Sequence, residues 1–307
     1  MQNNINKKLN FIFFGTPDVA SETLEILKEN GYMPSLVVTS PDAPKGRGLQ
    51  MQVSPVATFA KKNNIPCLKP EKNTELLSIF SSEEFGLAVR SEKKLEEAKY
   101  DLFIVVAYGK IIPENILNIP KLGSINLHYS LLPKYRGASP VESAILNGDA
   151  ETGITIQKME YKMDSGAIIA QEKVEIGNDE KAPDLRKRLI KIGGELLVKI
   201  LQTPSASCAS PEASARRAGH SPFAGGEKQD EIQATYCKKI KKEDGLIDLN
   251  DNAIKNYNKF RAYAYWPRTF FFKDGKRIII TEAKLENNQF IIEKVIPEGG
   301  KKMDYRP

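Results

Sequence analysis

Apolar runs alternate with helical patterns along the first 130 residues. Runs rich in β-branched and aromatic residues predict strands at 9–14, 36–39, 102–107 and 124–128. Between the first two runs, residues 18–29 place Leu24 and Leu27 on one side of a helix that meets Asn30 and Gly31, a common helix stop. Strands that alternate with helices are typical of a parallel sheet covered by helices. The sequence therefore predicts an α/β domain with a mostly parallel sheet.

The pattern changes after this region. We expect a helix at 138–147, two strands at 153–159 and 167–174 around a turn at 162–166, and a closing helix at 183–201. In residues 203–228, 17 of the 26 positions are Ala, Ser, Pro or Gly, and none is Leu, Ile or Val. Such a segment lacks the apolar residues that a packed unit needs, so we expect a disordered linker or insertion.

A second, smaller domain follows the low-complexity segment. Its aromatic and β-branched residues predict three strands at 268–272, 277–281 and 289–295, and hence a small β-barrel or curled sheet. We therefore divide the chain into a first domain at 1–202, a linker at 203–228 and a second domain at 229–307.

Composition narrows the functional class. The 307 residues are 41% hydrophobic and 27% charged, which is ordinary globular usage. No apolar run approaches the roughly 20 residues of a membrane span, so we expect a cytoplasmic protein with no membrane partner. Its three cysteines form no CxxC pair, which predicts neither disulfides nor a metal site. Residues 229–307 hold 16 Lys and Arg against 12 Asp and Glu, so this part is the better candidate for contact with a polyanion.

One strand end carries the candidate chemistry. Of two histidines, His220 lies in the low-complexity segment, which leaves His128 for any folded site. Asn126 and His128 are two apart and share one face of a strand, at the carboxyl end where ligands of open α/β sheets bind. An amide donor beside an imidazole suits acyl transfer to an amine, and a carboxylate such as Asp164 would complete the site. A structural Asn–His pair and an ordinary turn aspartate are the alternatives.

Longer motifs carry a family resemblance. The runs SINLHYSLLPKYRGASP at 124–140, GDAETG at 148–153 and MDSG at 163–166 strongly resemble the folate-dependent formyltransferases. The separation of 38 residues between Asn126 and Asp164 also matches the spacing of that family's catalytic Asn, His and Asp. The resemblance implies a Rossmann-like catalytic domain followed by an OB-like β-barrel, which looks shortened in this chain. It also implies that Asn126 and His128 stabilise the oxyanion and that Asp164 sets the state of His128.

Flanking motifs indicate which acceptor the resemblance implies. FGTPD at 14–18, PDAPKGRG at 41–48, VVAYG at 105–109 and RAYAYWP at 261–267 are similar to family members that formylate methionyl-tRNA. The implied donor is 10-formyltetrahydrofolate and the implied acceptor is methionyl initiator tRNA, with no metal and with a monomeric enzyme. The implied folate-binding residues are Ser130, Leu131, Leu132, Pro133, Ala107, Tyr108 and Gly109. The expected tRNA-binding residues are Lys45, Arg47, Lys238, Lys239, Lys241 and Lys242.

Alternatives stay open at this point. The basic residues also fit solvated loops, and for Tyr263, Tyr265 and Trp266 we favour packing over stacking on RNA. One rival function is formyl transfer to a small amine such as glycinamide ribonucleotide or an amino sugar. A rival of another class is a folate-binding or RNA-binding relative without turnover.

Overall fold

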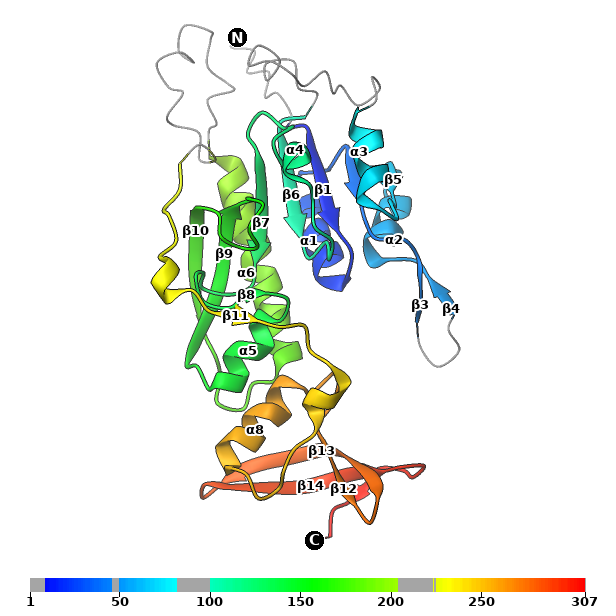
Figure 1. The fold of residues 1–307 in the computed structure, drawn as a ribbon, viewed down its shortest axis with the longest axis vertical. Helices are drawn as coiled ribbons and strands as arrows, with labels where there is room; N and C mark the ends of the chain where they lie inside the picture. The colour runs from blue at the N-terminus through cyan, green and yellow to red at the C-terminus, as the bar shows by residue number, and fades with distance from the viewer. Residues whose placement is uncertain (1–8, 46–49, 82–99, 204–222, 224, 307) are drawn as a thin grey trace, which may run out of the picture. The chain divides into compact units, whose positions relative to one another are not determined.

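A computed structural model describes residues 9–45, 50–81, 100–203, 223 and 225–306 (Figure 1). Arg47 and most of the expected linker at 203–228 lie outside the described residues. The chain forms two compact units, each assembled from separate stretches of sequence. The first contains residues 1–128, 155–172 and 190–230, and the second contains 129–154, 173–189 and 231–307.

A seven-stranded sheet forms the centre of the fold, in the order β10-β9-β7-β6-β1-β2-β5. Its strands are β1 (Phe11–Gly15), β2 (Leu36–Val38), β5 (Cys67–Leu68), β6 (Leu102–Val106), β7 (Ser124–His128), β9 (Glu151–Lys158) and β10 (Ile168–Glu175). The pairs of β1 with β2 and β6, of β2 with β5 and of β6 with β7 are parallel, whereas β7 and β9 run antiparallel. The predicted mostly parallel sheet is confirmed, and the short edge strand β5 was not predicted.

Helices connect these strands and supply the apolar faces that the sheet needs. They are α1 (Asp18–Glu29), α2 (Pro55–Lys62), α3 (Asn73–Ser81), α4 (Glu114–Leu117), α5 (Pro140–Asn147) and α6 (Ala182–Gln202). The helix α1 buries Leu24 and Leu27 and ends as predicted, because Gly31 takes a φ of 84°. A two-stranded hairpin, β3 (Ala43–Lys45) and β4 (Gln50–Gln52), precedes α2.

The C-terminal part is a four-stranded antiparallel sheet, in the order β12-β13-β14-β15. Its strands are β12 (Phe270–Lys273), β13 (Lys276–Glu286), β14 (Gln289–Pro297) and β15 (Met303–Asp304). The ring centroids of Phe271 in β12 and Tyr305 after β15 are 5.8 Å apart, so the two edges curl toward each other. Helix α8 (Ala253–Ala262) packs Tyr257 and Phe260 against Phe290 of β14. The predicted curled β-sheet is confirmed.

Further short elements lie before α8. They are β8 (Arg136–Gly137), the 3₁₀ helices η4 (Glu231–Gln233) and η5 (Lys242–Gly245), and β11 (Tyr236–Cys237). The strands β8 and β11 pair in parallel, although 100 residues separate Arg136 from its partner Tyr236. The pairing joins the loop after β7 to the start of the C-terminal part.

The three aromatic residues that follow α8 differ in how far they are buried. Tyr263 caps the helix and is buried, which agrees with the packing interpretation. Tyr265 and Trp266 are 75% and 50% exposed, so for them the packing interpretation is wrong. The physical reason is position: the Tyr263 N–H still bonds to the helix at the Lys259 carbonyl, whereas the next residues lie beyond the helix end.

Candidate active site

The end of β7 presents an amide and an imidazole on one face. Asn126 and His128 are both less than a tenth exposed, while Ile125 and Leu127, which alternate with them along the strand, are buried on its other face. These residues lie in the first compact unit, as does the antiparallel neighbour β9 over residues 155–158. The strand therefore holds two polar side chains in a largely dehydrated place, where hydrogen bonds are strong.

Asp164 completes this group from the turn after β9. Its Oδ1 accepts a hydrogen bond from Asn126 Nδ2 at 3.4 Å, and its Oδ2 lies 3.8 Å from His128 Nδ1. The Asp164 backbone has a φ of 50°, a left-handed conformation that aspartate tolerates better than most residues. The structure thus brings together the amide, imidazole and carboxylate that the sequence singled out.

Two glutamines that were not predicted hold Asp164. Gln157 stands opposite Asn126 in the β7–β9 register, and its Nε2 donates to Asp164 Oδ1 at 3.1 Å. The Nε2 of Gln229 lies 2.9 Å from the main-chain oxygen of Asp164, 2.8 Å from that of Gly166 and 3.1 Å from Gln157 Oε1. The carboxylate is therefore fixed through its side chain by one glutamine and through its backbone by the other.

The turn that carries Asp164 also needs a glycine. A Cβ added at Gly166 would lie 2.0 Å from the main-chain oxygen of Lys158 in β9. Since Lys158 belongs to the sheet, the clash would have to be relieved by movement of the turn. Gly166 thus allows the turn to approach β9 closely enough for the contacts of Asp164.

The segment after β6 reaches the same edge of the sheet. Val105 pairs with Asn126, so continuing the parallel register by two residues brings Ala107 level with His128. Ala107 and Gly109 are exposed and have φ values of 47° and 81°. Tyr108 instead packs its ring against Phe14 in the core, where burial raises the pKa of the phenol to about 12. The main chain, rather than the tyrosine ring, is the part of this segment open to a ligand.

The loop after β7 belongs to the second compact unit and has its own internal bonds. Ser130 is fully buried, and its hydroxyl donates to the main-chain oxygen of Lys134 at 2.6 Å. Leu132 is also buried, whereas Leu131 and Pro133 are half-buried. The Ser130 hydroxyl therefore shapes this loop.

A buried arginine anchors the far end of the same loop. Both terminal nitrogens of Arg136 donate to the carboxylate of Glu231, at 2.8 and 3.2 Å, although the Arg136 side chain is fully buried. This bidentate pair raises the pKa of the guanidinium above its ordinary value. The sequence showed no sign of the pair, because 95 residues separate its members.

The basic residues expected to contact tRNA are divided between the two compact units. Lys45 ends β3, its side chain is not described, and Arg47 lies outside the described residues. All four lysines between Lys238 and Lys242 are exposed, and within the described ranges none of them lies within 4.0 Å of a carboxylate. Residues 238–242 therefore concentrate positive charge after β11, and Glu243 and Asp244 follow them in η5.

The described part of the chain offers neither a metal-binding cluster nor a membrane-spanning helix. It holds no group of three or more His, Cys, Asp and Glu side chains placed to bind a metal ion. Nor does it contain a helix with the length and apolar character needed to cross a membrane.

The family models and the relatives that match this chain all indicate one family, the formyl transferases. Residues 7–201 match the family described as formyl transferase, and residues 239–297 match the formyl transferase C-terminal domain. A protein of Geobacter sulfurreducens named methionyl-tRNA formyltransferase is 37% identical over 273 residues, covering 88% of this chain and 76% of the relative.

Solved structures show the same fold. A methionyl-tRNA formyltransferase from Clostridium thermocellum matches with a TM-score of 0.53 at 17% identity, covering 97% of this chain and all of the other. An N-formyltransferase from Helicobacter canadensis, in complex with folinic acid and dTDP-3-aminofucose, matches with a TM-score of 0.59 at 20% identity, covering 91% of this chain and 88% of the other. At these identities the likeness concerns the fold alone.

Proposed function

We propose that this chain, which belongs to the formyl transferase family, transfers the formyl group of 10-formyltetrahydrofolate to the α-amino group of methionine on initiator tRNA. The observation that carries the acceptor is the 37% identity to a methionyl-tRNA formyltransferase across 88% of the chain. The match of residues 239–297 to the family's C-terminal domain gives further support.

Asn126, His128 and Asp164 are the catalytic residues of this proposal. The amine nitrogen bonds to the formyl carbon, and negative charge then develops on the formyl oxygen. The amide of Asn126 and the imidazole of His128 are donors that stabilise this charge within a largely buried site. The bond from carbon to the folate nitrogen then breaks, and that nitrogen takes up a proton.

In this proposal Asp164 accepts the proton that the attacking amine loses. The amine must lose a proton when it becomes an amide, and a carboxylate can accept it directly or through water. The position of Asp164 Oδ2, 3.8 Å from His128 Nδ1, supports a second role in stabilising the protonated imidazole. These roles need no covalent intermediate on the enzyme.

The proposal also assigns residues to the binding of folate and of tRNA. We assign the folate to the exposed main chain at 107–109 and to Ser130, Leu131, Leu132 and Pro133, which begin two residues after His128. We assign the tRNA to Lys45, Arg47 and the four lysines between Lys238 and Lys242, which supply cations for phosphates. The domains would be 1–202 for catalysis and 229–307 for tRNA contact, in line with the two matched family regions.

Transfer to a small amine is the less favoured function. Solved amino-sugar formyltransferases share the fold, but at 20% identity they carry no argument about the acceptor. Loss of turnover is not favoured either, since the amide of Asn126 and the imidazole of His128 each lie within 3.8 Å of the Asp164 carboxylate.

Single substitutions in the proposed group test the mechanism. We expect Asn126→Ala and His128→Ala each to lower the rate of labelled formyl transfer to methionyl initiator tRNA by about 10² or more, the usual cost of one oxyanion donor. Asn118→Ala, at an exposed asparagine after α4, is the matched control and should leave the rate unchanged. Near-normal transfer by either site variant, with a folded protein by circular dichroism, would overturn the assigned roles.

A further inference from the structure

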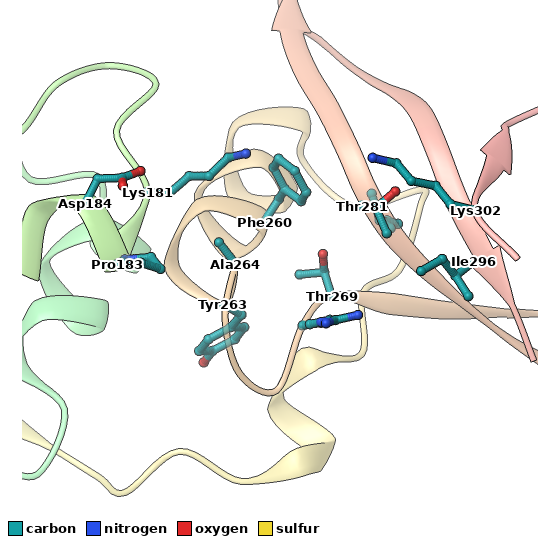
Figure 2. Close-up of a pocket in the computed structure, with 12 residues that line it drawn as sticks. Lys181, Pro183, Asp184, Phe260, Tyr263, Ala264, Thr269, Thr281, Ile296 and Lys302 are labelled. Atoms are coloured by element: carbon teal, nitrogen blue, oxygen red, sulfur yellow. The ribbon is translucent and has the colours of Figure 1, made fainter. Parts of the chain in front are cut away.

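A cationic pocket lies in the second compact unit, formed by the start of α6, the end of α8 and strands β13 and β14. Its volume is about 440 Å³, within the range of small-molecule sites. Figure 2 shows Lys181 and Lys302 extending toward each other from opposite sides, with the Phe260 ring between them and Thr269 below. Phe260 and Ile296 supply apolar wall.

The charges lining this pocket favour an anion. Lys181, Arg268 and Lys302 contribute three cations, against the single carboxylate of Asp184. Within the described ranges neither Lys181 nor Arg268 lies within 4.0 Å of a carboxylate, and the Lys181 ammonium sits 5.1 Å above the ring centre of Phe260. Lys302 pairs with Glu282, which also pairs with Lys294, so the carboxylate there is shared between two lysines.

A buried hydroxyl without a partner among the described residues borders the same pocket. Thr269 is 1% exposed and lines the pocket, and its Oγ1 has no hydrogen-bond partner among the described residues. An unpaired buried hydroxyl costs free energy, so a site that leaves one unpaired gains stability when a ligand supplies the partner. The hydroxyl can donate to a ligand oxygen that the lysines attract.

The backbone of Arg268 gives an independent indication. Its φ is 67°, a left-handed conformation that is unfavourable for a long side chain and favourable for glycine. The conformation is fixed from both sides: its N–H donates to the Tyr263 oxygen, and its carbonyl oxygen would lie 2.2 Å from a Cβ at Gly245. Arg268 thus adopts a backbone conformation that glycine would adopt with less strain, and its side chain lines the pocket.

We propose that this pocket binds a nucleoside phosphate, with the phosphate held by Lys181, Arg268 and the Thr269 hydroxyl and the nucleoside against the Phe260 and Ile296 side. The same chemistry comes from a free nucleotide or from one nucleotide unit of an RNA. The site is separate from the group around Asp164, which belongs to the first compact unit.

Binding of adenosine 5′-monophosphate to the full chain, measured by isothermal titration calorimetry, tests the proposal without any formyl transfer. We expect saturable binding that is at least about 10-fold tighter than that of adenosine, because the charge-assisted contacts are made by the phosphate. Lys181→Ala and Arg268→Gly should each weaken this binding by about 10-fold or more. Lys187→Ala, on the exposed face of α6 and outside the pocket, is the charge-matched control and should leave it unchanged.

The arginine variant separates binding from folding. Because glycine relieves the left-handed strain, Arg268→Gly should melt at the same or a higher temperature while it loses the nucleotide. Equal binding of the nucleotide and the nucleoside, or nucleotide binding that survives both pocket variants, would overturn the proposal. The Michaelis constant for methionyl-tRNA then distinguishes the source: it rises in Arg268→Gly if an RNA nucleotide occupies the pocket, and stays unchanged if the ligand is free. The calorimetric result is independent of formyl transfer, whereas the Michaelis constant rests on the proposed function.

Discussion

Replacing Gln157 by leucine tests whether Asp164 must be held in place for turnover. The Gln157 side chain donates a hydrogen bond of 3.1 Å to Asp164 Oδ1, which is shorter than the bond of 3.4 Å from Asn126. Leucine has a similar volume and suits a position that is 2% exposed, so the change causes little loss of packing. It removes the donor to Asp164 and also the oxygen that accepts a hydrogen bond from Gln229.

The magnitude follows from the kind of bond that is lost. A hydrogen bond to a charged group contributes about 1.5–3 kcal/mol. If the bond stabilises the transition state by that free energy, its loss lowers turnover about 10- to 150-fold. The Michaelis constants for folate and tRNA should stay within about two-fold, because the bond orients a catalytic group and does not touch either substrate.

Steady-state formyl transfer, measured with the concentrations of both substrates varied, gives the turnover number and the two Michaelis constants separately. The matched control is Gln171→Leu in β10, which also removes a glutamine hydrogen bond within the sheet, the one of 2.8 Å that Gln171 donates to Thr155. Gln157→Glu adds a second test, since it places a like charge beside Asp164 and should impair turnover at least as strongly as leucine. Turnover of Gln157→Leu within about two-fold of wild type, or an equal fall in the Gln171 control, would refute the positioning role.

Three further changes probe other parts of the account. Gly166→Ala would place a Cβ 2.0 Å from the Lys158 oxygen and move the Asp164 turn, so turnover should fall by about 10² in the transfer assay while the sheet stays folded by circular dichroism. Changing the four lysines between Lys238 and Lys242 to alanine should make tRNA binding less dependent on salt, lowering the slope of log affinity against log salt by up to about 3 in a filter-binding titration. The pKa of Glu282 is lowered from 4.5 to about 2 by its two lysine partners, so its stabilising effect is present above the ordinary value and is lost as the pH falls toward 2. Glu282→Gln should therefore melt below wild type at pH 7, and calorimetry should show this difference shrinking as the pH is lowered through that range; a difference that stays constant with pH would exclude the ion pairs as its cause.

The central sheet was predictable because its strands are short apolar runs with clear boundaries. The strand at β7 was predicted with the bounds that the structure has, and alternation along it correctly paired Asn126 with His128 on one face. The edge strand β5 was missed since two residues leave almost no pattern. Exposure of Tyr265 and Trp266 was also missed, because aromatic character alone does not show where a helix ends.

The support for the candidate site was not predictable from one sequence. The contact of Asp164 with Asn126 depended on a family resemblance, since no local pattern joins residues 38 apart. Gln157 reaches Asp164 only because the β7–β9 register sets it opposite Asn126. Gln229 lies just past the low-complexity segment, 65 residues from Asp164, where composition carries no signal of a contact. Such contacts arise from register and chain return, which hydrophobic periodicity does not encode.

Formyl transfer by the purified chain, with its acceptors compared in one experiment, tests the central claim most directly. Labelled 10-formyltetrahydrofolate would be offered with methionyl initiator tRNA and, in parallel, with glycinamide ribonucleotide and a nucleotide-linked amino sugar. The account predicts label on the α-amino group of the charged tRNA and none above background on either small amine. Label on a small amine alone, or folate binding without any transfer, would contradict it.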